Sequence, residues 1–408
     1  MIAAASSSAT DSEGAVVSTT QIGVSMAALV GMVSSRLADA LVRPMMQYRS
    51  AMSIFVSIAA YCDPVLPFTL RRAVEQASHP EALHLVVVNQ RPAGSPPLDE
   101  SGLAPSRLTV LDIDATQARG PCWARALAMT LYEGEDWFFQ IDSHMDFDPG
   151  WDTRLIHAAH GIARHQRRCV ISSYPNAFEF EGGHPVSRAV TGKVLAHVLK
   201  PGCRFADDHP VLSFEAHPVE IDAALRGYHL GAGCLFAPGA FVQQFPYDPY
   251  LYFHGEEQAL AARLYTHGWD IFHIPALPVY HLYRAVGADA SARPLHWDAA
   301  HDQVRKNRWW ALEARSRARL QALVTRSQDL GVYGLGSERT MAQYAAFCGI
   351  DYELRTIAPR AFHGPWGNAQ RPPAPNNHLA ATRPPAAPEP PSSPLTEPAT
   401  ANPEAPPQ

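Results

Sequence analysis

The chain has 408 residues, a formal net charge of −6 and 47% apolar residues. This acidic balance, with no block of Lys or Arg, argues against a protein that coats nucleic acid, so we expect no nucleic-acid partner. The length suits one large domain or two smaller ones, and the apolar content is enough for a sizeable core. The six cysteines are scattered without a CxxC pair, which argues against a zinc ribbon.

Residues 1–50 are expected to form an N-terminal extension, partly disordered or helical. Its apolar stretch, residues 22–33, has twelve residues, too few for a helix that crosses a bilayer. No basic residue precedes this stretch, as one would in a signal peptide. The sequence therefore favours a packing helix, with a short membrane anchor as the alternative. We expect no stable membrane span and a cytoplasmic location.

Strands and helices alternate in the main domain, which we place at residues 51–290. Short apolar runs predict strands at 53–58, 83–88, 108–111 and 137–141. Apolar residues recur at helical spacing over 65–78 and 121–133, with Pro121 near the first turn of the second helix. This alternation predicts an α/β fold with a mainly parallel central sheet flanked by helices.

The rest of the chain mixes elements and ends in a tail. We predict a strand at 231–236, a helix at 256–266, extended pieces at 271–274 and 279–282, and a helical region at 297–325. Residues 291–363 are assigned to a mainly helical C-terminal extension. Residues 364–408 are expected to be a disordered Pro-rich tail, because 13 of the 38 residues from 371 onward are proline and almost none is large and apolar.

Two polar residues, Asp142 and His144, follow directly after the predicted strand 137–141. Ligands of open parallel sheets bind beyond the carboxyl ends of the strands. In an extended segment, side chains two positions apart point to the same side, so both residues can reach one ion. A carboxylate with an imidazole suits a divalent ion such as Mn²⁺, with zinc as the alternative. The triplet alone is weak evidence for a metal site.

The glycine-rich run GAGCLF at 231–236 allows a backbone to approach a ligand closely, which makes Gly231 and Gly233 candidates for ligand binding. A strand bulge with no ligand nearby is the alternative for these glycines. Several longer segments accompany this run. They are IDSHMDF (141–147), GWD (150–152), PYDPYLYFHGEEQALAARLYTHGWDIF (246–272), HLYR (281–284) and YGLGSERTMAQYAAFCGIDYE (333–353).

In this order the segments resemble the nucleotide-sugar transferases of the GT-A fold. More narrowly, they resemble glycosyltransferase family 60, the polypeptide GlcNAc-transferases that modify hydroxyproline on Skp1-type proteins. The mucin-type polypeptide GalNAc-transferases are a more distant match. The resemblance implies a metal-dependent, retaining enzyme that moves GlcNAc from UDP-GlcNAc to a protein or peptide hydroxyl. It also implies a GT-A catalytic domain at 51–290.

The resemblance assigns roles to single residues. It makes His281 the third metal ligand beside Asp142 and His144, although an interior hydrogen-bonded histidine is the alternative. It matches Glu256 and Glu257 to the acidic pair that lines the sugar and acceptor pocket. Adjacent helix positions point about 100° apart, so only one of the two is expected to face the pocket, with Glu257 favoured.

Further matches concern the donor. The resemblance implies that Ala59, Ala60 and Tyr61 form the nucleoside-binding turn, and that Arg119, Gly120 and Arg125 face the donor together with Asp142. A solvated charge is the alternative for Arg125. One departure is Asn89, which stands where many GT-A enzymes have an aspartate that holds the uracil, although an amide can also pair with a uracil edge.

Other functions remain as alternatives at this stage. A transferase of GalNAc or galactose from a UDP-sugar to a peptide or glycan differs from the favoured one at few contacts. A zinc metallohydrolase would use the same three ligands, but no HExxH motif supports it. A third alternative is a non-catalytic scaffold whose Pro-rich tail binds partners. A nicotinamide dehydrogenase is disfavoured, because no GxGxxG follows the first strand.

Overall fold

The structure is a computed structural model that describes residues 52–188, 193–283 and 294–364. The predicted N-terminal extension lies outside the described residues, as do Arg284 of the HLYR segment and the Pro-rich tail from residue 365. Within the described ranges, no helix has both the length and the apolar character to cross a bilayer.

An eight-stranded sheet lies at the centre of the fold, in the order β11-β13-β6-β12-β4-β1-β2-β3. In this order its strands are Leu225–Gly227, Asp270–His273, Cys169–Ile171, Cys234–Pro238, Trp137–Asp142, Ile54–Tyr61, Leu83–Arg91 and Arg107–Asp114. β4, β1, β2 and β3 run parallel to one another, whereas β12 is antiparallel to both of its neighbours. The sheet is mainly parallel, as predicted, and the carboxyl ends of β1, β2 and β4 lie at one edge.

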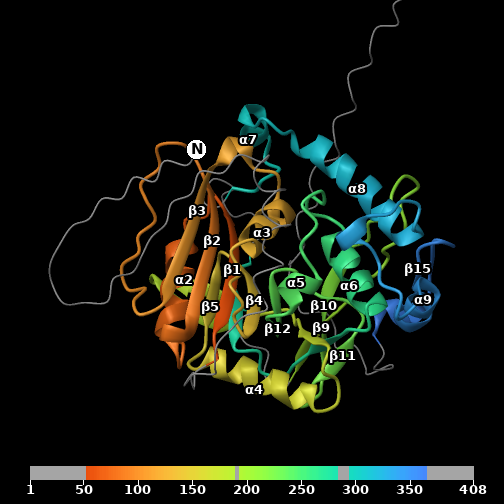
Figure 1. The fold of residues 1–408 in the computed structure, drawn as a ribbon, viewed down its shortest axis with the longest axis horizontal. Helices are drawn as coiled ribbons and strands as arrows, with labels where there is room; N and C mark the ends of the chain where they lie inside the picture. The colour runs from red at the N-terminus through yellow and green to blue at the C-terminus, as the bar shows by residue number, and fades with distance from the viewer. Residues whose placement is uncertain (1–51, 189–192, 284–293, 365–408) are drawn as a thin grey trace, which may run out of the picture.

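Helices cover both faces of this sheet. The helices of the described residues are α2 (Leu66–Glu75), α3 (Pro121–Met129), α4 (Trp151–Ala163), α5 (Phe241–Gln244), α6 (Glu256–Thr266), α7 (Ala299–Val304), α8 (Trp309–Thr325) and α9 (Met341–Cys348). In Figure 1, β1, β2 and β3 stand at the left of the view, α4 runs along the bottom and α8 lies at the upper right.

The alternation of side chains along β1 separates two apolar cores. Ile54, Val56 and Ile58 point to one face and pack with residues of α2 and α4. Phe55 points to the other face and packs in a larger core with residues of α3, α6, α8 and α9. Since successive strand residues face opposite sides, both faces of the sheet are buried, which explains the continuous apolar run of this strand.

The described ranges also contain three smaller sheets. A four-stranded sheet has the order β5-β14-β7-β8, and the other two are the pairs β10-β9 and β15-β16. The bounds are Met145–Phe147 (β5), Val279–His281 (β14), Asn176–Glu181 (β7), His184–Arg188 (β8), Val194–Leu199 (β9), Phe214–Val219 (β10), Ile350–Asp351 (β15) and Thr356–Ile357 (β16). β14 pairs with β5 so that His281 lies opposite Met145. This register joins two segments that are more than 130 residues apart in the sequence.

The helix after β1 is shorter than predicted, ending at Glu75 instead of residue 78. The backbone N–H groups of Ser78 and His79 each donate a hydrogen bond of 2.8 Å to the carboxylate of Asp152, at the start of α4. These bonds give the two N–H groups partners outside the helix. The chain therefore turns toward β2 before residue 78, where the helical spacing of apolar residues ends.

Other predicted elements also differ from the structure. The helix predicted at 121–133 ends at Met129. The strand predicted at 231–236 begins only at Cys234, because the N–H of Cys234 donates to the carbonyl of Gly231 and closes a turn. The helical region predicted at 297–325 is two helices, α7 and α8. Asp302 near the end of α7 accepts the N–H of Trp309 at 2.8 Å, which starts a new helix instead of continuing the first.

Candidate functional site

Asp142, His144 and His281 lie together at the carboxyl edge of the large sheet. Asp142 is the last residue of β4, His144 comes immediately before β5, and β14 brings His281 alongside β5. One ligand atom from each of the three residues lies within 4.8 Å of the other two. The Nε2 atom of His281 is 3.2 Å from Oδ2 of Asp142, and the two imidazole rings are 4.6 Å apart. One carboxylate oxygen and two imidazole nitrogens form a donor set that fits a divalent transition-metal ion.

The carboxyl group of Asp142 is held in its charged form. Burial acts to raise the pKa of Asp142, but the hydrogen bond with His281 and the charge of Arg125 hold this pKa well below its usual range. Nη2 of Arg125 donates to Oδ1 of Asp142 at 3.0 Å. A carboxylate that stays ionised is ready to bind a cation without first losing a proton.

His144 is oriented by a residue that the sequence reasoning missed. Its Nδ1 lies 2.7 Å from Oδ2 of Asp63, which follows β1. The hydroxyl of Ser143 donates to the same carboxylate oxygen at 2.6 Å. Although burial opposes it, these two hydrogen bonds lower the pKa of Asp63. A signal was available, because Asp63 stands just past a buried strand in the same way as Asp142.

The neighbouring residues Glu256 and Glu257 have different environments. Glu256 is buried, accepts a hydrogen bond of 2.7 Å from Nη1 of Arg125 and accepts another of 2.8 Å from the thiol of Cys122. Glu257 is less buried and accepts the N–H of Ala232 at 2.9 Å. Burial raises the pKa of Glu257 to about 7. Glu256 thus belongs to an ion pair, while Glu257 is the one that is accessible.

Arg125 joins the acidic pair to the candidate metal ligands. Its guanidinium group reaches Glu256 with one terminal nitrogen and Asp142 with the other, and its side chain is only 4% exposed. Burial acts to lower the pKa of Arg125, but the charge of Glu256 raises it well above its ordinary value. The structure therefore places Arg125 in a buried charge network and not at the surface, where a solvated charge would lie.

The two predicted glycines have different neighbours. A Cβ atom on Gly233 would lie 2.5 Å from Oδ2 of Asp142, so any side chain there would displace the carboxylate. A Cβ atom on Gly231 would lie 2.4 Å from the ring of His197, a buried imidazole. The hydroxyl of Ser172 donates to the carbonyl of Gly231 and accepts its N–H. Gly233 therefore borders the candidate metal ligand Asp142, whereas Gly231 packs against the protein interior.

The residues at the ends of β1 and β2 lie at the same sheet edge. The methyl group of Ala60 is fully buried in the core, and so the neighbouring residues Ala59 and Tyr61 point to the opposite face. The ring of Tyr61 meets the ring of His296 edge-on at 6.3 Å. Asn89, at the end of β2, donates a hydrogen bond of 3.0 Å to Asp112 on β3. Asp112 is a carboxylate at this edge that the sequence reasoning did not select.

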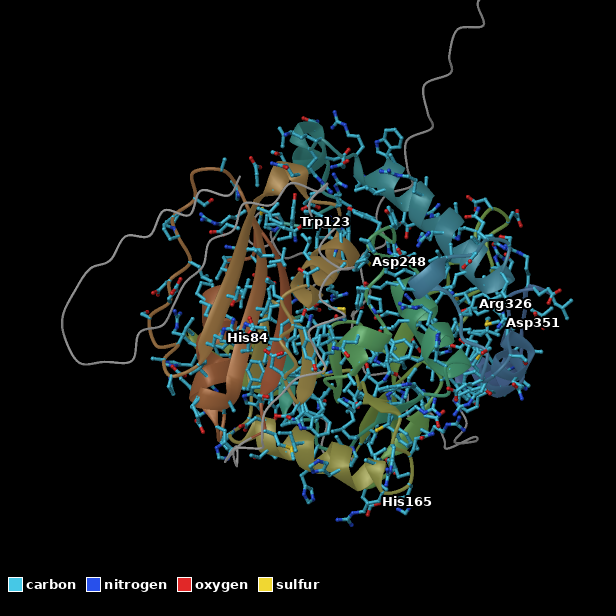
Figure 2. All side chains as sticks on the ribbon, viewed as in Figure 1. His84, Trp123, His165, Asp248, Arg326 and Asp351 are labelled. Atoms are coloured by element: carbon cyan, nitrogen blue, oxygen red, sulfur yellow. The ribbon has the colours of Figure 1, made fainter. Side chains whose placement is uncertain are left out.

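The remaining predicted donor residues precede α3. Gly120 is the N-cap of this helix with a φ of 92°, and a Cβ atom there would lie 2.5 Å from the ring of Tyr252. Glycine is required here both for the backbone conformation and for the close approach. The guanidinium carbon of Arg119 lies 5.7 Å from the ring centre of Trp123. Figure 2 labels Trp123 on α3, in the central part of the view.

The family model of the glycosyltransferases described as "Glycosyltransferase (GlcNAc)" matches residues 53–108 and 98–354. These two matches together cover well over half of the chain. The chain belongs to this family. It is therefore a member of a glycosyltransferase family with the α/β fold predicted from the sequence, and the narrower assignment to family 60 stays a prediction.

Other comparisons add less. A solved structure of "GalNAc-T7 with UDP, GalNAc and Mn2+" is similar over 75% of this chain, with 14% identity and a TM-score of 0.44. The glycosyltransferase chain spans 60% of the length of that protein. No curated protein sequence matches this glycosyltransferase chain.

Proposed function

We propose that this glycosyltransferase transfers GlcNAc from UDP-GlcNAc to a hydroxyl group of a protein, in a reaction that depends on Mn²⁺ or another divalent ion. The observation that carries the proposal is the meeting of Asp142, His144 and His281 at the edge of the sheet. In this proposal the three side chains hold the ion. When bound there, a divalent ion neutralises the negative charge that develops on a departing nucleoside diphosphate.

The remaining roles follow from the contacts of each side chain. Arg125 keeps Asp142 charged and fixes its carboxylate. Because Gly233 has no side chain, the Asp142 carboxylate can lie close to the backbone of this turn. Ala59, Tyr61, Asn89, Arg119 and Gly120 are proposed to contact the donor, and Ala60 is proposed to do so through its backbone only. We assign Gly231 a supporting role behind this surface, since its space is taken by His197.

Glu257 is proposed to face the sugar and the acceptor. It is the more accessible member of the acidic pair, and its pKa of about 7 allows it to exchange a proton near neutral pH.

Retention of the anomeric configuration is proposed from the family resemblance, with the acceptor attacking from the face that the diphosphate leaves. A hydroxyproline side chain is the acceptor that the resemblance favours. GalNAc and galactose are the alternative sugars.

The first test measures which ligands stabilise the protein against heat. UDP and Mn²⁺ together are expected to raise the melting temperature more than either one alone. Both ligands bind the folded protein and not the unfolded chain, so each adds to the stability of the folded state. Stabilisation by zinc without any dependence on UDP would instead favour the metallohydrolase.

Mass spectrometry of peptide products from UDP-GlcNAc, UDP-GalNAc and UDP-galactose then identifies the sugar, with proline and hydroxyproline peptides as paired acceptors.

The second test removes one ligand. His144→Ala is expected to abolish metal-dependent transfer while leaving the circular dichroism spectrum unchanged, because the ring is partly exposed and its hydrogen bonds within the described residues are to Asp63 and Ser143. Full activity in this variant would refute the metal assignment.

A cytoplasmic location is also part of the proposal. All six thiols are unpaired in the structure, which fits a reducing compartment. Cell fractionation of the natural host, with the protein detected by antibody, tests this location directly.

A further inference from the structure

We infer that Asp63 is a positioning residue of the metal site, whose carboxylate fixes the orientation and the tautomer of the His144 ring. The inference rests on the proposed metal site and assigns a role to a residue outside it. Asp63 is not one of the three candidate ligands, and it follows β1, whereas those ligands lie at the end of β4, just before β5 and on β14.

Both oxygen atoms of the Asp63 carboxylate accept hydrogen bonds. Oδ2 lies 2.7 Å from Nδ1 of His144 and accepts the hydroxyl of Ser143 at 2.6 Å. Oδ1 accepts the backbone N–H of Val65 at 2.9 Å. The side chain of Asp63 is only 3% exposed. A buried carboxylate that accepts three hydrogen bonds from fixed donors cannot turn away from His144 without leaving those donors unsatisfied.

These contacts determine which nitrogen of His144 carries the proton. An ionised carboxylate only accepts hydrogen bonds, so Nδ1 of His144 must be the donor. In the neutral imidazole the proton on Nδ1 leaves the lone pair on Nε2. Nε2 is therefore the atom that His144 can offer to a cation. Carboxylates that bind the second nitrogen of a metal-binding histidine act in this way in other metal sites.

The backbone around His144 is also fixed from the same side. Thr69, in the first half of α2, donates its hydroxyl to the carbonyls of Ser143 and Met145 and accepts the N–H of Met145 at 2.8 Å. Asp63 holds the side chains of this loop, and Thr69 holds its main chain. The segment from β1 to α2 thus places the His144 ring relative to His281 before any ligand binds.

The test compares Mn²⁺ affinity in three variants with that of the natural protein, from the electron paramagnetic resonance signal of free Mn²⁺. Asp63→Asn and Asp63→Ala are expected to weaken binding 10- to 100-fold, the usual cost of losing such a partner. Asp152→Asn is the matched control. Asp152 is also buried and accepts two hydrogen bonds of 2.8 Å, but it lies near the start of β2, at the opposite edge of the sheet. The affinity of the Asp152→Asn variant for Mn²⁺ should equal that of the natural protein.

A second measurement needs no metal and no variant at Asp63. In ¹⁵N spectra of metal-free protein, His144 should be protonated at Nδ1, with the resonance identified by its loss in His144→Ala. A proton on Nε2 with none on Nδ1 would overturn the inference, as would unchanged Mn²⁺ affinity in folded Asp63→Asn and Asp63→Ala. If His144→Ala itself binds Mn²⁺ normally, the metal site fails as well. If only the Asp63 variants bind normally, the metal site stands and the inference alone fails.

Discussion

Gly233 and Asp142 are in such close contact that the geometry of one depends on the other. A methyl group on Gly233 would meet Oδ2 of Asp142 at 2.5 Å and force the carboxylate aside. We therefore expect Gly233→Ala to weaken Mn²⁺ binding on the order of 10-fold, as other disturbances of metal-ligand orientation do. Calorimetric titration measures this. Gly161→Ala is the control, because a Cβ atom there meets nothing within 4 Å. Equal affinities in both variants would contradict the expectation.

Glu257 gives the protein a characteristic pH dependence of stability. Burial raises its pKa from an ordinary 4.5 to about 7. Between these values the folded protein keeps a proton that the unfolded chain has released, so the free energy of unfolding falls as the pH rises. Over this whole range the fall attributable to Glu257 is on the order of 3 kcal/mol, and roughly 2 kcal/mol of it lies above pH 5.5.

Urea denaturation of metal-free protein at pH 5.5 and pH 8 measures this fall. Glu257→Gln removes the titrating group, so its free energy of unfolding should decrease less between the two pH values than that of the natural protein. Glu353→Gln, at an exposed position, is the control. Identical pH dependence in Glu257→Gln and the natural protein would show that Glu257 titrates normally.

At the scale of elements, Arg125 connects three of them. It lies on α3, pairs with Asp142 at the end of β4 and pairs with Glu256 at the start of α6. We expect Arg125→Met to lower the free energy of unfolding by about 3–5 kcal/mol, because it leaves a buried carboxylate without its partner. Adding Glu256→Gln should restore part of this loss.

The control for Arg125 is Arg107→Met. Arg107 pairs with Glu133, but both side chains are more than half exposed. Exposed pairs contribute about 0–1 kcal/mol, so this variant should retain nearly full stability in urea denaturation. A loss in Arg125→Met no larger than that in Arg107→Met would show that the three elements do not depend on the bridge.

How far the sequence predicts these elements depends on where their signals lie. The sequence predicts β1, β2, β3 and β4 because each is a largely apolar run, and Asp142 and His144 were located from the end of β4. The short strands β5 and β14 bring His144 and His281 together, yet β5 has three residues and carries no periodic pattern. Their pairing is a contact between distant segments, and only the family resemblance indicated His281.

Other differences have local causes that apolar periodicity does not encode. Asp63 escaped notice because its partners, Ser143 and His144, are about 80 positions away in the sequence. The break between α7 and α8 comes from one hydrogen bond of Asp302. The burial of Arg125 depends on two carboxylates from other elements, so the sequence left a solvated charge open as an alternative.

At the scale of the whole molecule, residues 294–364 share a core with the large sheet and its helices. Residues of α8 and α9, such as Leu320 and Tyr344, belong to the same apolar cluster as Phe55 on β1 and Leu260 on α6. The ion pair between Arg319 and Asp248 adds a polar contact of 2.6 Å between α8 and the loop before α6. Figure 2 labels Asp248 beside α8 in this view. A shared core favours cooperative unfolding of both parts, although the boundary at residue 290 itself stays a prediction.

Leu320 provides the test of this cooperativity. Its side chain is fully buried, and it lies so close to Gly255, the residue before the acidic pair, that a Cβ atom on Gly255 would meet it at 2.7 Å. Leu320→Ala should lower the free energy of unfolding by about 2–5 kcal/mol. Tryptophan fluorescence and far-ultraviolet circular dichroism should still report one coincident transition in urea. Val332→Ala, at a position 69% exposed, should change stability by no more than about 0.5 kcal/mol. Two separate transitions in Leu320→Ala would mean that the C-terminal part unfolds independently, and α8 would then not stabilise the helix that carries Glu256 and Glu257.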